Sequence, residues 1–199
     1  MGTDIERLLE LVKEKSLMYG DFTLSSGLKS SYYFDGRLTT LWPEGAYLVG
    51  KTVFELVRDA GIDAIGGPTM GADPIVAAVA LVSHLEGKPI PAFMVRTQPK
   101  KHGTQRYIEG HLPPGGTVAI VDDVITTGGS VFRAIEAVEA EGCRVGQVVV
   151  LLDRNQGGAD ELRRRGYKFA ALLRVDNKGE VCQDAPEKRG KMTHKIPLP

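Results

Sequence analysis

Two adjacent carboxylates and a following loop of glycines and small hydroxyls form the segment of this chain best suited to chemistry. Residues 118–130 read VAIVDDVITTGGS, so an apolar run ends in Asp122 and Asp123. Glycines let a loop turn its N–H groups inward, and a helix that follows presents its positive end, so a phosphate is well received. Carboxylates repel phosphate but accept hydrogen bonds from vicinal hydroxyls. The segment therefore predicts a ribose over the two acids and its 5′-phosphate on Thr126, Thr127, Gly128, Gly129 and Ser130.

Other interpretations of the same segment are possible. The acids could cap the next helix while the glycines only make a turn. The pattern ends a buried strand, however, at the edge where open α/β sheets bind ligands, and this favours a binding site. No Gly-Lys-Ser or Gly-Lys-Thr follows the glycines, so a nucleoside triphosphatase loop is disfavoured.

Strand-like and helix-like segments alternate around these residues. Strands are expected near 63–66, 92–95, 117–121, 145–152 and 168–175, and helices over 43–59, 74–85, 129–140 and 159–165. Such alternation indicates βαβ units with right-handed crossovers. We therefore expect an α/β fold with a doubly wound, mainly parallel sheet, whose ligands bind at the carboxyl ends of the strands.

The N-terminal part is expected to add a helix and a hood to this core. Apolar residues recur at helical spacing from Ile5 to Val12, which predicts a helix that ends near Leu17. The β-prone runs 22–24 and 32–34 then predict a small hairpin or flap. The length of 199 residues suits a single domain, 1–199. We divide it into an N-terminal helix and hood (1–42), a core (43–175) and a polar tail of partial order (176–199).

The overall composition excludes several classes of partner. Twenty-five basic residues balance 25 acidic ones, so no global charge draws the chain to nucleic acid or to a membrane surface. No apolar run approaches a membrane span or a secretory signal, so we expect a cytoplasmic protein. Cys143 and Cys182 form no CxxC pair, and a disulfide framework is not expected. The four histidines lack HExxH spacing, and a zinc site is not expected either.

One long basic stretch interrupts the alternation of strands and helices. Residues 96–114 contain Arg96, Lys100, Lys101 and His102 together with a Pro-Pro pair. Unstructured connections longer than about 12 to 15 residues are usually functional or disordered in compact domains. The stretch therefore predicts either a functional loop or a solvated basic face.

Several of these segments resemble one enzyme family. The run 118–130 is similar to the phosphoribosyl-pyrophosphate signature of the type I phosphoribosyltransferases. Residues 22–34 (FTLSSGLKSSYYF) resemble the flap of the orotate phosphoribosyltransferases, and 67–74 (GPTMGADP) resemble their pyrophosphate loop. The basic stretch 96–103 looks like their mobile catalytic loop, and 152–154 (LDR) resemble the strand end whose arginine meets the orotate carboxylate. The resemblance covers roughly residues 5 to 175, in the same order, and implies the type I phosphoribosyltransferase fold.

The resemblance also implies a reaction and the residues that perform it. Such enzymes transfer 5-phosphoribose from phosphoribosyl pyrophosphate to orotate in pyrimidine biosynthesis, giving orotidine 5′-phosphate and pyrophosphate through an oxocarbenium-like transition state. Mg²⁺ is implied as the cofactor, held by substrate and water with no direct protein ligand, and a homodimer that shares its mobile loops is implied as the assembly. The implied catalytic residues are Arg96, Lys100, His102, Asp122 and Asp123. The implied substrate-binding residues are Lys29, Tyr33, Phe34, Met70, Gly71, Ala72, Asp73, Lys101, Thr126, Thr127, Gly128, Gly129, Ser130 and Arg154.

The sequence departs from the family pattern and leaves alternatives open. Many bacterial relatives carry lysine at the positions of Ser25 and Thr97, and Lys29 and Lys101 are the candidates to replace part of that charge. A purine or uracil phosphoribosyltransferase would share residues 118–130, although it would not need Arg154. A regulator that keeps the nucleotide pocket as a sensor is a third alternative, but no basic patch or helix-turn-helix supports it.

Overall fold

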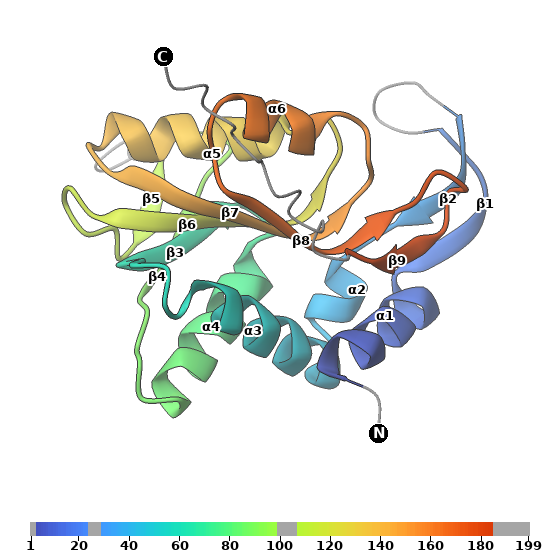
Figure 1. Cartoon of the computed structure of the whole chain (residues 1–199), viewed down its shortest axis with the longest axis horizontal. Helices are drawn as coiled ribbons and strands as arrows, with labels where there is room; N and C mark the ends of the chain where they lie inside the picture. Colours follow the sequence, from blue (N-terminus) through green and yellow to red (C-terminus); the bar gives the residue numbers. More distant parts are fainter. Residues whose placement is uncertain (1–2, 24–28, 99–106, 185–199) are drawn as a thin grey trace, which may run out of the picture.

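A mainly parallel sheet forms the centre of the computed structural model, which describes residues 3–23, 29–98 and 107–184. Within these ranges the strand order is β5-β4-β3-β6-β7-β8-β9 (Figure 1). The parallel strands are β3 (Ala64–Pro68), β4 (Ala92–Val95), β6 (Thr117–Ile125), β7 (Arg144–Asp153) and β8 (Phe169–Val175). The antiparallel edges are β5 (Ile108–Gly110) and β9 (Val181–Gln183). The predicted doubly wound, mainly parallel sheet is confirmed.

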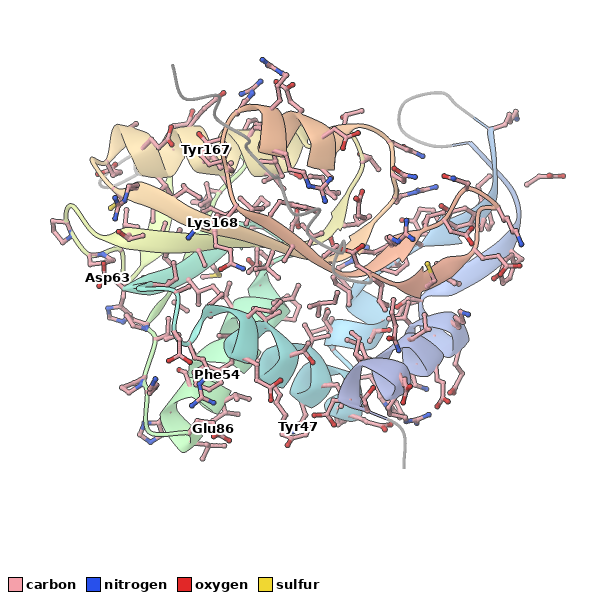
Figure 2. The ribbon with its side chains drawn as sticks, in the orientation of Figure 1. Tyr47, Phe54, Asp63, Glu86, Tyr167 and Lys168 are labelled. Atoms are coloured by element: carbon pink, nitrogen blue, oxygen red, sulfur yellow. The ribbon has the colours of Figure 1, made fainter. Side chains whose placement is uncertain are left out.

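Helices cover both faces of this sheet and bury a core on each. One face carries α1 (Asp4–Lys15), α2 (Arg37–Thr40), α3 (Pro43–Val57) and α4 (Asp73–Leu85), and the other carries α5 (Gly129–Ala140) and α6 (Gly158–Arg164). Figure 2 places Phe54 on the α3 face and Tyr167 on the α5 face. Phe54 is buried in the apolar core on the face of the sheet that carries α3 and α4. On the other face, the Tyr167 hydroxyl donates to Glu139 on α5 at 3.0 Å. None of the helices in the described ranges is long and apolar enough to cross a membrane.

The N-terminal hood is a separate two-stranded sheet. Strand β1 (Leu17–Thr23) pairs antiparallel with β2 (Lys29–Phe34), as the hairpin prediction requires. Helix α1 ends at Lys15, two residues before the predicted end, because Leu17 already begins β1. The buried hydroxyls of Ser16 and Thr39 share a hydrogen bond of 2.6 Å, which ties this corner to α2.

Three features of the sheet differ from the sequence prediction. Strand β6 continues past Val121 to Ile125, because β7 offers ladder partners as far as Asp153, so both acids lie within the strand. The stretch expected to be one long loop, 96–114, contains β5, which returns along β4. The predicted tail contains β9 as the last edge strand, and its residues 185–199 lie outside the described ranges.

The junction between β3 and β6 offers a test of packing. A Cβ atom on Gly67 would lie 1.9 Å from the carbonyl oxygen of Val121 and 2.7 Å from the Cβ atom of Ala72. Gly67→Ala should therefore lower the free energy of unfolding by about 1–3 kcal/mol, measured by denaturant titration. Gly20→Ala is the matched control, since its nearest neighbour would be a Phe22 ring atom at 3.4 Å. Equal midpoints for both variants would contradict the close approach.

Candidate active site

Asp122 is a buried carboxylate that holds the start of α5 in place. Its side chain sits near the end of β6 and only 4 % of the residue is exposed. One carboxylate oxygen accepts the Asp123 N–H at 3.0 Å, and the other accepts the Ser130 hydroxyl at 2.8 Å. Burial, and then the charge of Asp123, raise the pKa of Asp122 to about 8. The acid therefore resists ionisation in the free protein.

Asp123 lies between two glycines that approach it from different elements. A Cβ atom on Gly71, in the β3–α4 loop, would lie 2.4 Å from one carboxylate oxygen of Asp123 and 2.7 Å from an oxygen of Asp122. A Cβ atom on Gly36, at the end of the hood, would lie 2.8 Å from the Cβ atom of Asp123. Burial raises the pKa of the Asp123 carboxyl. Both carboxylates thus lie against Gly71 in the β3–α4 loop. A side chain at Gly71 or Gly36 would collide with the acids.

The loop after β6 has the geometry predicted for a phosphate cradle. Gly128 has φ of 89° and forms the N-cap of α5, a conformation that glycine adopts without strain. The N–H of Gly158 donates to the Thr126 carbonyl at 2.9 Å, so the start of α6 supports the loop from behind. Thr127 and Gly129 are exposed on the open side. The first N–H groups of α5 have no acceptor within the helix and suit a phosphate.

The loop between β3 and α4 presents a second helix start beside the acids. Met70 is exposed and the Thr69–Met70 peptide bond is cis. The N–H of Ala72 donates to the Pro68 carbonyl at 3.2 Å, which leaves this group less available than predicted. One carboxylate oxygen of Asp73 is buried and has no hydrogen-bond partner among the described residues, and burial raises the Asp73 pKa. The start of α4 stays the predicted pyrophosphate site, because a helix dipole favours an anion at that end.

Arg154 follows β7 and is held almost completely inside the protein. It is 8 % exposed, and its N–H donates to the Ile125 carbonyl at 3.0 Å, which binds it to the β6 loop. Its guanidinium carbon lies 4.7 Å from the centroid of the Tyr32 ring on β2. Its Nε is buried without a hydrogen-bond partner among the described residues. A buried guanidinium fork with an unmet donor is suited to an incoming carboxylate.

The hood and the basic stretch account for the remaining predicted residues. Lys29 is exposed at the start of β2, Tyr33 is partly exposed, and the side chain of Phe34 is buried in the core, so a ligand would meet Phe34 through its main chain. Arg96 is exposed after β4 and pairs with Glu109 at 3.6 Å. Three predicted residues of the basic stretch lie outside the described residues: Lys100, Lys101 and His102.

Sequence reasoning missed the residues that the hood brings to the site. Tyr32 lies beneath Arg154, and Gly36 contacts Asp123, although neither was predicted to act there. Gly158, which supports the phosphate loop, was also missed. The charged triplet 35–37 directly after an aromatic strand was the available signal, since such a group rarely ends a strand without a partner.

The described residues do not form a cage for a metal ion. No group of three or more His, Cys, Asp or Glu side chains is placed to hold one in the ranges that the structure covers. Both oxygens of Asp122 already accept hydrogen bonds from the protein. This donor set fits an ion that is held mainly by substrate oxygens and water.

The chain is similar in sequence and in fold to known proteins. Residues 41–178 match the family model of the phosphoribosyl transferase domain. The orotate phosphoribosyltransferase of Aquifex aeolicus is 44 % identical over 173 residues, covering 85 % of this chain and 94 % of the relative. A crystal structure of the Mycobacterium tuberculosis orotate phosphoribosyltransferase with Fe(III) dicitrate superposes with a TM-score of 0.78 at 39 % identity, covering 87 % of this chain and 97 % of that one. A structure of the same enzyme in complex with 5-phospho-alpha-D-ribosyl 1-diphosphate gives 0.74 at 35 % identity, with 86 % and 96 % covered. The family model matches more than half of the chain and the sequence similarity extends over most of it, so the chain belongs to the orotate phosphoribosyltransferase family.

Proposed function

We propose that the protein transfers the 5-phosphoribosyl group of phosphoribosyl pyrophosphate to orotate, giving orotidine 5′-phosphate and pyrophosphate. The observation that carries this choice of base is the buried guanidinium of Arg154, whose Nε has no partner among the described residues. It lies next to the phosphoribose site because its N–H is bound to Ile125 at the end of β6. Orotate bears a carboxylate that uracil and the purine bases lack, and this group matches the fork.

Each part of the donor is proposed to bind a different element. The 5′-phosphate binds the N–H groups at the start of α5, and the ribose hydroxyls donate to Asp123, the more exposed of the two acids. Asp122 orients the cradle through its hydrogen bond from Ser130. The pyrophosphate binds at the start of α4, near Met70 and Gly71. This arrangement fixes C1 of the ribose between the leaving group and the base.

The transfer exchanges one bond at C1 for another. The bond from C1 to the pyrophosphate oxygen breaks with its electron pair on oxygen, while a ring nitrogen of orotate forms a bond to C1 and gives up its proton to the departing pyrophosphate or to water. Negative charge builds on the pyrophosphate, so cations that close over it stabilise the transition state. Arg96, Lys100 and His102 are proposed for this role, and loop closure would exclude water. Mg²⁺, held by the substrate and water, would neutralise part of the same charge when bound.

We also propose a homodimer in which each subunit lends its 96–103 loop to the partner's site. Large apolar side chains are exposed on the helical face opposite α5, and a second copy would cover them. They are Leu38, Leu41, Trp42, Tyr47, Leu56, Leu81 and Leu85.

The Tyr32 ring should contribute to orotate binding through Arg154. Tyr32→Leu removes the face on which the guanidinium rests, and we expect the KM for orotate to rise about 2- to 30-fold. Tyr32→Phe keeps that face and should stay near the wild type, as should the KM for phosphoribosyl pyrophosphate in both variants. Steady-state kinetics with each substrate varied in turn would measure this. Similar effects of the Leu and Phe substitutions would contradict a role for the ring.

A direct assay tests the proposed function. Purified protein with Mg²⁺ and phosphoribosyl pyrophosphate should consume orotate, seen as loss of its ultraviolet absorbance, and should leave adenine, hypoxanthine and uracil unchanged. Turnover of uracil at the same rate would overturn the assignment of the base. Binding of phosphoribosyl pyrophosphate without turnover of any base would favour the sensor alternative.

A further inference from the structure

A charged turn at the end of the hood packs directly on the ribose-binding acid. Residues 35–37 connect β2 to α2, and Gly36 lies so close to Asp123 that an added Cβ would be 2.9 Å from a carboxylate oxygen. The turn is fixed at its start, because the Asp35 N–H donates to the Ser16 carbonyl at 3.0 Å. It is fixed at its end by N–H groups of Thr39 and Thr40, which donate to the Gly36 carbonyl at 3.0 and 2.9 Å.

The turn carries one acid and one base, and these are bound to each other. Arg37 Nε donates to Asp35 Oδ1 and Arg37 Nη2 donates to Oδ2, both at 2.9 Å. The Arg37 N–H also donates to Oδ1, at 3.0 Å. These three hydrogen bonds, two from the guanidinium and one from the main chain, hold Arg37 in one place although its side chain is 39 % exposed. The hydrogen bonds from Arg37 lower the pKa of Asp35, so its carboxylate stays ionised.

Both of these charges act on the pKa of Asp123. After burial, Asp35 raises the pKa of Asp123 and Arg37 lowers it. On its own strand Asp123 lies next to Asp122. The other group bonded to the Asp122 carboxylate is the hydroxyl of Ser130 at the start of α5, which is neutral. From the β3–α4 loop the contact is Gly71, which has no charge, and the raised pKa of Asp73 is due to its own burial. Arg37 is therefore a cation that offsets the charge of the carboxylates around Asp123.

We propose that Arg37 is a positioning residue for the transferase reaction: fixed on Asp35 beside the glycine that contacts Asp123, it keeps Asp123 available as an acceptor for the ribose hydroxyls. The inference rests on the proposed function only for the identity of the sugar phosphate. Asp35 serves two opposed purposes in this arrangement. It holds the guanidinium in place, and it adds a negative charge that Arg37 must offset. The hood therefore acts on both halves of the site, on Arg154 through Tyr32 and on Asp123 through Arg37.

Opposite effects of the two partners test this proposal. Arg37→Gln leaves Asp35 uncompensated and should shift the acid limb of phosphoribosyl pyrophosphate binding to higher pH, with binding about 2- to 5-fold weaker on that limb. Asp35→Asn removes the negative charge and should shift the limb to lower pH. The double variant should return toward the wild type, and Arg37→Lys should restore most of the binding. Calorimetric titration with phosphoribosyl pyrophosphate across the acidic and neutral range would measure each limb.

A matched control separates electrostatics from damage to the fold. Arg164→Gln breaks a still shorter pair, in which Arg164 Nε and Nη2 donate to Glu161 at 2.6 and 2.7 Å on the surface of α6, and it should leave the acid limb unchanged. If the acid limb moved in the same direction in Arg37→Gln and Asp35→Asn, or did not move in either, the proposal would be overturned. Orotate turnover by the wild type would not be affected by that result. Failure of the wild type to use orotate, with opposite limb shifts retained, would refute the proposed base and leave this inference intact.

Discussion

The Asp122→Asn variant should unfold at a higher temperature than the wild type at pH 8. Asp122 is buried, and its pKa is raised to about 8, so the folded protein pays to ionise it. Asparagine has the same shape and can keep both hydrogen bonds: its oxygen accepts the Asp123 N–H, and its amide donates to the Ser130 hydroxyl. Removal of an ionisable buried group that is required for function commonly raises stability.

The sign of the pH dependence follows from the direction of this shift. Because the pKa is higher in the folded protein than the ordinary value of 3.8, the folded state binds more protons than the unfolded state between those two values. The contribution of Asp122 is fully present below the ordinary value, and it is lost as the pH rises through the folded pKa. The gain in Asp122→Asn should therefore be small at pH 4 and on the order of 1–3 kcal/mol near pH 8.

Thermal unfolding of both proteins across this pH range measures the effect. Asp176→Asn is a control of opposite sign. Hydrogen bonds from the N–H groups of Glu180 and Lys178 lower the Asp176 pKa, so loss of this carboxylate should destabilise the protein at neutral pH. A stability difference that does not change with pH would refute the electrostatic origin of the gain.

Arg154→Lys should lower kcat/KM for orotate about 10- to 150-fold and leave the KM for phosphoribosyl pyrophosphate unchanged. Lysine keeps the charge, but it loses the planar fork and the stacking on Tyr32, where the guanidinium carbon now lies 4.7 Å from the ring centroid. The expected loss corresponds to a charge-assisted hydrogen bond.

Substrate-specific kinetics would check this expectation. Arg174→Lys is the matched control, because Arg174 pairs in register with Asp153 on the neighbouring strand but is exposed and lies 3.5 Å from Asp184. It should behave as the wild type. An equal loss for both substrates in Arg154→Lys would mean that the substitution disturbs the fold of the β7 end and that Arg154 has no special relation to the base.

The parts of this site that come from one continuous segment were predictable from the sequence. The acids, the glycine loop and α5 follow one another between residues 118 and 140, so their spacing fixes their arrangement. The contacts of Tyr32 and Gly36 were not predictable, because they join residues about 90 to 120 positions apart through the docking of a separate sheet. The predicted end of β6 at Val121 was wrong, because two adjacent acids are typical of a strand end. The ladder with β7 continues beyond them to Ile125.

The central position of β6 in the sheet affects how amide protons exchange with solvent. Strand β6 is paired on both sides, by β3 and β7, whereas the hood is a two-stranded sheet of its own. Amide protons of β6 should exchange with solvent only through global unfolding, and those of the hood through local opening at lower cost. The acids thus rest on the most slowly exchanging strand, while Tyr32 belongs to an element that can open without it and Arg37 follows that element at the start of α2. Ligand binding should slow exchange most in the hood, and the completed site would then exist only while the hood is closed.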